Sequence, residues 1–126
     1  MAEFSDWMEN KIIEVMRATT FTAAAAYVAL YTVAPTDAGG GTEVSGGSYA
    51  RQLAGLSVAS AGASSNAADI TFPTATADWG TVVACALFDA VTVGNMYMWS
   101  LLDVSKTVAS GDTFKLSAGD LDVTIA

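Results

Sequence analysis

The chain has 126 residues, with 5 Lys and Arg against 13 Asp and Glu, one cysteine and no histidine, and its formal net charge is −8. This acidity argues against nucleic-acid binding, and the absence of histidine excludes a Ser-His-Asp triad, so we predict no enzyme, no metal and no cofactor. Only 14% of the residues are charged, against about 25% in typical domains, which indicates that other chains cover part of the surface.

The first segment is predicted to be an amphipathic helix over about residues 5–18. Asp6 is the expected N-cap, with Glu9 three residues later. Apolar residues recur at helical spacing and form one face of this helix: Trp7, Met8, Ile12, Val15 and Met16. Such a face either covers a sheet edge or docks into a neighbouring chain. We therefore predict a helical anchor over residues 1–20 and a β domain over 21–126, within one globular unit.

No targeting or membrane segment is expected. Acidic residues stand where a secretory signal needs basic ones. The most apolar stretch, residues 21–34, is shorter than the ~20 residues that cross a bilayer. We therefore expect no signal peptide and no membrane partner.

The rest of the chain is predicted to form short strands separated by loops of small residues. The expected strands are Tyr27–Val33, one or two within 49–58, then 70–72, 82–88, 96–102, 113–116 and 121–125. Residues 35–42, with three consecutive glycines, and residues 60–66 are expected loops. Seven or eight strands without intervening helices predict a mainly β, antiparallel domain, either a β-sandwich of jelly-roll type or a small barrel.

Acidic and thiol side chains offer few candidates for chemistry. Cys85 lies within an apolar run and is expected to be a small core hydrophobe. Most aspartates stand at expected turns, where Asp commonly bonds to nearby backbone amides. A carboxylate pair for glycoside hydrolysis and a calcium site at Asp112, Asp120 and Asp122 remain weak alternatives.

The glycine-rich loops and one arginine are the remaining candidates for an interface. The glycines do not form a phosphate-binding motif, since no lysine and no helix follow them. Arg51 is the only cation between Arg17 and Lys106, so we expect a specific partner, Glu43 or Asp78, within the chain or across an interface. The candidate interface residues in these loops are Gly40, Gly46, Gly47, Tyr49 and Arg51.

Four aromatic residues are candidates for a sugar-binding face: Tyr49, Trp79, Tyr97 and Trp99. Carbohydrate stacking needs exposed rings beside polar groups. Aromatic residues at strand centres more commonly belong to a core or an interface. We therefore favour the core or interface interpretation for these four side chains.

A series of segments, in order along nearly the whole chain, carries a family resemblance. They are VALYT at 28–32, PTD at 35–37, EVSGGSYARQ at 43–52, FPTATADWG at 72–80, LFD at 87–89, SKTV at 105–108, SGD at 110–112 and AGDL at 118–121. Together they resemble a family of small tailed-bacteriophage structural proteins, whose members are commonly called tail fibre or minor structural proteins. The resemblance implies a virion component made in the host cytoplasm and assembled in symmetric copies, with no catalytic residues.

Two functional hypotheses follow, together with a weak third, a cell-wall hydrolase. The leading one is a capsid decoration, or cement, protein that forms a homo-oligomer, of which a trimer is one form, and contacts the major capsid protein or other virion proteins. Its helix would anchor the subunit, and loops 35–48 and 60–66 would contact neighbours. The alternative is a tail fibre or tail tip component that binds host surface polysaccharide, and only this alternative has a carbohydrate partner.

Overall fold

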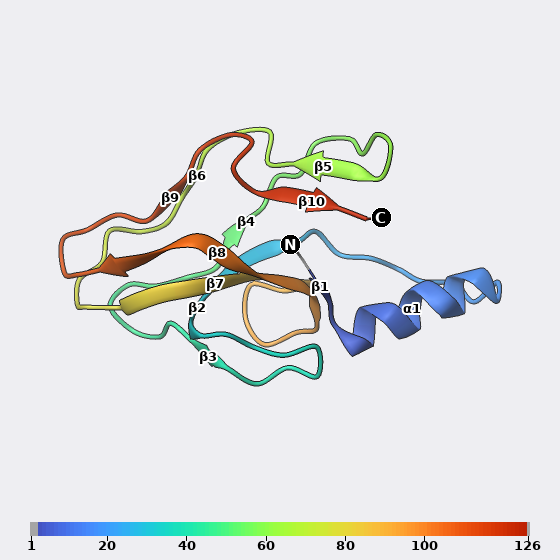
Figure 1. Ribbon diagram of the computed structural model, residues 1–126, viewed down its shortest axis with the longest axis horizontal. Helices are drawn as coiled ribbons and strands as arrows, with labels where there is room; N and C mark the ends of the chain where they lie inside the picture. Colours follow the sequence, from blue (N-terminus) through green and yellow to red (C-terminus); the bar gives the residue numbers. More distant parts are fainter. Residues whose placement is uncertain (1–2, 126) are drawn as a thin grey trace.

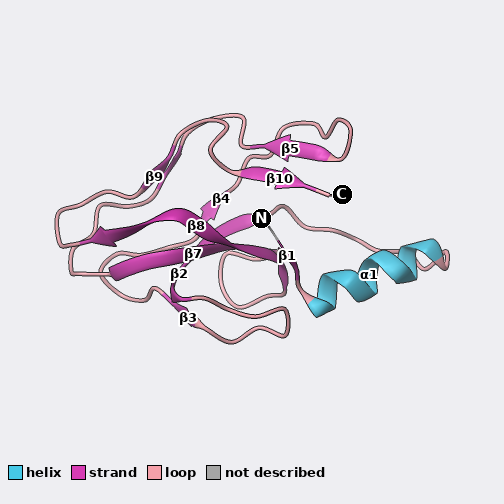
Figure 2. Cartoon of the chain, in the orientation of Figure 1, coloured by secondary structure: helices cyan, strands magenta, loops and turns pink. Residues whose placement is uncertain are grey.

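The computed structural model describes residues 3–125, which form one helix and ten strands. Residues 1, 2 and 126, which belong to the predicted anchor and β domain, lie outside the described residues. The elements are β1 (Glu3–Phe4), α1 (Asp6–Met16), β2 (Tyr27–Val33), β3 (Thr42–Glu43), β4 (Gln52–Leu53), β5 (Ala63–Ser65), β6 (Ile70–Thr71), β7 (Gly80–Phe88), β8 (Met96–Val108), β9 (Lys115–Leu116) and β10 (Asp122–Thr124) (Figures 1 and 2). The predicted mainly β, antiparallel fold behind one N-terminal helix is confirmed.

One six-stranded sheet organises the molecule. Its order is β1-β8-β7-β2-β3, and β4 also pairs with β2. The central strands β7 and β2 pair from Tyr27 opposite Phe88 to Tyr31 opposite Ala84. Both strands are nearly continuous apolar runs, as expected where side chains on each face are covered. Two short ribbons, β5–β10 and β6–β9, lie on one side of this sheet (Figure 1).

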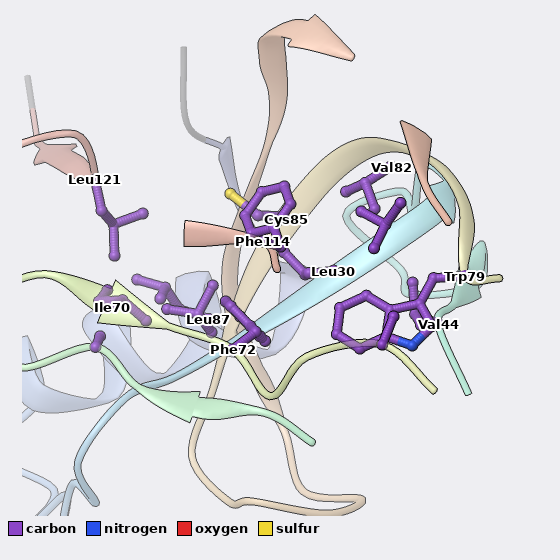
Figure 3. Close-up of a cluster of buried hydrophobic side chains, with 14 of the residues drawn as sticks. Leu30, Val44, Ile70, Phe72, Trp79, Val82, Cys85, Leu87, Phe114 and Leu121 are labelled. Carbon is purple, nitrogen blue, oxygen red and sulfur yellow. The ribbon is translucent and has the colours of Figure 1, made fainter. Parts of the chain in front are cut away.

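The main core lies between the sheet and the two ribbons. The aromatic rings of Phe72 and Phe114 meet edge to face in this core, with centroids 5.6 Å apart. Each fully buried side chain of this size stabilises the fold by about 1.5–3 kcal/mol through its apolar area. Figure 3 shows the cluster, which includes Leu30, Val44, Ile70, Val82, Cys85, Leu87 and Leu121.

The opposite face of the sheet carries a second, smaller cluster. Its buried members are Ala29, Tyr31, Ala84, Ala86, Phe88 and Met96, with Trp99 packed against them. Alanine on neighbouring strands leaves room for the larger rings to cover this face.

A β-bulge interrupts the alternation of side chains between the two faces of β8. Alternation predicts Met96 and Met98 on the same face, but they belong to different clusters. In the ladder Leu87 lies opposite Met98 and Phe88 opposite Met96, so Tyr97 is an extra residue. The extra residue interrupts the two-residue period of the strand and moves Met96 to the second cluster.

Two predicted boundaries are wrong in detail. Residues 60–66 were expected to be a loop, yet Ala63–Ser65 forms β5 and pairs with β10. The strand predicted over 96–102 continues to Val108 as β8, which pairs with β7 along both halves. In both places backbone pairing decides the structure, and the side chains show no apolar alternation that would reveal it. Within residues 49–58, where one or two strands were expected, one forms, Gln52–Leu53.

Candidate assembly surface

The start of α1 is held by the sheet and by a neighbouring turn. Ser5 is the N-cap, because its hydroxyl accepts a hydrogen bond from the Met8 amide at 3.1 Å and also donates to the Met96 carbonyl. The predicted N-cap, Asp6, is instead the first helical residue, and its amide donates to the Asp37 carbonyl at 2.9 Å. The extended backbone of Ser5, with φ −73° and ψ 155°, suits the capping position.

The two ends of the helix have different surroundings. The ring of Trp7 lies against Phe21 and Tyr97, with centroids 5.9 and 6.0 Å apart, so the first turn packs on its own domain. Figure 1 shows α1 extending away from the strands at one end of the molecule. No residue of α1 is fully buried, and its last turns expose the apolar side chains Ile13, Val15 and Met16.

The predicted apolar face of α1 therefore divides into two parts. Trp7 and Met8 are half-buried against the domain, and Ile12 is also half-buried. Val15 and Met16 face solvent, with Met16 74% exposed. Ile13, which the periodicity did not assign to this face, is about half exposed and adds to the same uncovered end.

An apolar groove of about 490 Å³ runs between the first turn of α1 and the segment that follows the helix, residues 21–26. Met8, Phe21 and Tyr97 contribute to its wall, together with alanines of residues 23–26 and the end of β4. The Tyr97 hydroxyl holds the segment of residues 21–26 in place, because it donates to the Ala24 carbonyl at 2.8 Å and accepts from the Ala24 amide at 3.1 Å.

Arg51 forms a buried cluster that ties two loops together. Its guanidinium forms a two-point ion pair with Glu43, with N–O distances of 2.9 Å. It also donates to the carbonyls of Ala90 at 3.0 Å and Val93 at 2.7 Å, and it lies 3.8 Å from the centroid of the Phe88 ring. Planar, two-point pairing of this kind is specific to arginine. Glu43, one of the two predicted partners, is therefore the partner of Arg51.

Tyr49 completes this cluster. Its hydroxyl donates to the Glu43 carboxylate at 2.7 Å and accepts from the Leu30 amide at 3.0 Å. Burial, followed by the nearby Glu43 charge, raises the pKa of Tyr49 above its ordinary value. The other predicted partner of Arg51, Asp78, instead accepts from the Ser110 amide at 2.8 Å. Tyr49 and Arg51 thus contact their own chain and present little surface to another subunit.

The glycines of the candidate interface serve turns. Gly40, Gly46 and Gly47 have positive φ angles, which glycine adopts without steric cost. A side chain at Gly40 or Gly46 would meet open space, whereas at Gly47 a Cβ would lie 2.9 Å from Trp79 Nε1. Gly40 and Gly46 are therefore accessible to a neighbouring subunit, and Gly47 closes against its own core.

The four aromatic candidates do not form one face. Trp79 is only 6% exposed, packs edge to face on Tyr49, and donates from Nε1 to the Gly47 carbonyl. Tyr97 lies beside α1, whereas Trp99 covers the second cluster and donates to Asp37 at 2.9 Å. The favoured core interpretation holds for Trp79 and Tyr49.

The remaining titratable groups have structural roles. Cys85 lies in the main core as predicted, and burial raises the pKa of its thiol to about 11, so it is neutral near pH 7. Asp112 and Asp120 accept amide hydrogen bonds from residues three positions earlier. Within residues 3–125, no group of three or more acidic, cysteine or histidine side chains is placed to hold a metal.

Comparison with known protein families identifies the family of the chain. No curated protein is significantly similar to the chain. No helix among the described residues is long and apolar enough to cross a membrane. Residues 3–124 match the family described as Podophage GP4 fiber I protein gp80, a family of phage virion structural proteins. Because this match spans nearly the whole sequence, the chain belongs to that family.

Proposed function

We propose that the chain is a fibre subunit of a tailed-phage virion and that it assembles with further copies of itself through the projecting end of α1. The family description supports a fibre protein, and the uncovered apolar end of the helix supports a contact between chains. A structural subunit of this kind needs no catalytic group, so we propose no enzymatic activity.

The observation that carries the proposal is the exposure of Ile13, Val15 and Met16 on a helix anchored at its other end. A helix that packs only on its own domain normally turns its apolar side chains inward. Here the apolar side chains of the last turns point to solvent, although the first turn is fixed by Ser5 and Trp7. Ile13 and Met16 are three residues apart, which is a spacing that helix recognition uses, whereas Val15 projects from another side of the same end.

The mass of the full chain in solution tests this contact. We expect the wild-type chain to form a defined oligomer, and a variant with Ile13→Gln, Val15→Gln and Met16→Gln to be monomeric by light scattering. Glutamine keeps a high helix propensity, so the circular dichroism spectrum should be unchanged. Deleting the whole helix is a poorer test, because it also removes the Ser5 and Trp7 contacts to the domain.

A matched control places the same substitution elsewhere. Val58 is 95% exposed and lies outside α1, so Val58→Gln should leave the oligomer intact. A wild-type chain that stays monomeric at high concentration, or a triple variant with the wild-type mass, would contradict self-assembly through α1.

Capsid decoration is the second candidate, and the low charge content favours it. A surface with 14% charged residues suits broad coverage by neighbouring virion proteins, including the major capsid protein. Copy number separates the two locations, since a closed shell repeats its decorating subunit over its whole surface whereas a tail holds far fewer copies. Quantitative gel analysis of purified particles measures this number directly.

A further inference from the structure

The apolar groove beside the first turn of α1 has an uncharged wall. Fifteen residues line it, and none of them is Asp, Glu, Lys or Arg. Its only side-chain hydroxyl, that of Tyr97, already forms two hydrogen bonds with Ala24. Because a polar or charged group buried without a partner costs free energy, this groove favours an occupant with apolar side chains.

Exposed apolar side chains gather at this groove and at the projecting end of α1. Among residues 3–125, twelve large apolar side chains are exposed, and five of them lie in these two places. Ile13, Val15 and Met16 belong to the helix end, whereas Leu53 and Leu56 line the groove. The other seven are on strands and loops that do not line the groove. One chain thus carries a projecting apolar surface and a concave one, and exposed patches of this kind mark contacts with other proteins.

One row of helix residues joins the two surfaces. Met8, Ile12 and Met16 follow one another at intervals of four, so their side chains lie along the same side of α1. Met8 lines the groove, whereas Met16 is exposed. At a rise of about 1.5 Å per residue, the two residues lie about 12 Å apart along the helix axis. Because α1 cannot fold back to place its own end in this groove, a helix end that fills it belongs to another chain.

The spacing of this row suits a pair of identical helices. Ile12 stands midway between Met8 and Met16. When two copies lie antiparallel with Ile12 against Ile12, Met16 of each copy reaches Met8 and the groove of the other. The same contact then forms twice, which is the closed arrangement of a two-fold dimer.

The size of the contact also favours this reciprocal arrangement. A standard interface has about 20–30 residues on each side. The helix end alone offers four apolar residues, at positions 12, 13, 15 and 16, which are too few for a stable contact between two helix ends. Together with the fifteen residues that line the groove, they bring each copy close to about 20 residues.

We propose that the groove binds the projecting end of α1 from a second copy of the chain, in a reciprocal, antiparallel pair of helices with Ile12 at the two-fold axis. Leu53, Leu56 and the alanines of residues 23–26 form the receiving wall. This inference rests on the proposed self-assembly through α1, and it adds the surface that the helix end contacts.

Light scattering on the full chain tests the groove. We expect a mass of two chains for the wild-type chain and of one chain for a variant with Leu53→Gln and Leu56→Gln, because the substitutions make the receiving wall polar. Both leucines are exposed, so the circular dichroism spectrum should be unchanged. A variant with Leu101→Gln and Val104→Gln is the matched control, since these side chains are exposed on β8 outside the groove, and it should keep the mass of two chains.

An engineered disulfide tests the register of the two helices without altering the groove. Ile12→Cys should form a disulfide between two chains under mild oxidation, because the two-fold axis brings the two thiols together. Asn10→Cys is the control, since residue 10 is exposed on another side of α1 and should give a single chain on a non-reducing gel. The native Cys85 is buried and should not react.

The possible outcomes separate this inference from the proposed function. A groove variant with the mass of the wild-type dimer, or equal cross-linking through residues 10 and 12, would overturn the reciprocal pair and leave self-assembly through α1 standing. A wild-type mass of three chains would overturn the pair as well, because a two-fold contact closes at two copies. A wild-type chain that stays monomeric at high concentration would overturn both proposals.

Discussion

At the scale of single residues, one buried cation organises much of the structure around the sheet edge. Scarcity of positive charge was enough to predict that Arg51 has a specific partner, and Glu43 was one of the two candidates. The sequence could not choose between Glu43 and Asp78, because that choice depends on strand pairing. Glu43 lies opposite Tyr31 in the ladder between β3 and β2, which brings it to the central sheet.

Replacing Arg51 by methionine leaves Glu43 without its cation and two loop carbonyls without their donor. We expect the free energy of unfolding to fall by roughly 3–5 kcal/mol, the range for breaking a buried pair. Urea denaturation followed by tryptophan fluorescence measures this change. Arg17→Met is the control, because its pair with Glu14 is exposed and should contribute less than about 1 kcal/mol. Equal losses in the free energy of unfolding would show that the Arg51 cluster stabilises the fold no more than an exposed ion pair does.

Stability should fall at alkaline pH because three buried groups hold their protons more tightly in the folded chain. Burial raises the pKa of Cys85 to about 11 and also raises the pKa values of Tyr31 and Tyr49. Above its ordinary pKa each group loses its proton in the unfolded chain but keeps it in the folded chain. Unfolding is therefore favoured increasingly as the pH rises above about 9.

Urea midpoints at about pH 7, 9 and 10.5 measure this loss of stability. A Cys85→Val variant should lose less stability between the last two values than the wild-type chain does. A midpoint that stays constant over the whole range would contradict the assigned burial of these groups.

At the scale of elements, apolar patterning predicted β2, β7 and the first half of β8, together with the short strands β4, β6, β9 and β10, and it missed β5. The bounds of β2 agree with the prediction, because its apolar run ends at a proline and a glycine-rich turn. β5 could not be predicted, since its Ala-Ser-Ser sequence carries no alternation and only pairing with β10 makes it a strand. The helix was predicted within two residues at each end, but its cap is Ser5, which reaches β8 through a contact distant in sequence.

Two glycines in one turn should respond differently to the same substitution. Gly46→Ala adds a methyl group in open space and should cost only the strain of a positive φ, about 1 kcal/mol. Gly47→Ala places its Cβ 2.9 Å from Trp79 Nε1 and 3.0 Å from the Ala77 carbonyl oxygen. We expect a further loss of about 1–3 kcal/mol, because this packed turn must shift. Thermal unfolding of both variants measures the difference, and equal melting temperatures would contradict the tight contact.

At the scale of the whole molecule, the family match identifies a phage virion structural protein, and the uncovered end of α1 is the observation behind the proposed self-assembly. The sequence resemblance gave the same broad class, a phage virion structural protein, and the match over residues 3–124 confirms it.

The position of the chain on the intact virion tests the central proposal most directly. Particles labelled with an antibody against this chain can be imaged by electron cryo-microscopy. The proposal predicts label confined to the fibres of the tail. Label distributed over the head shell would contradict it and would identify the chain as a capsid decoration protein.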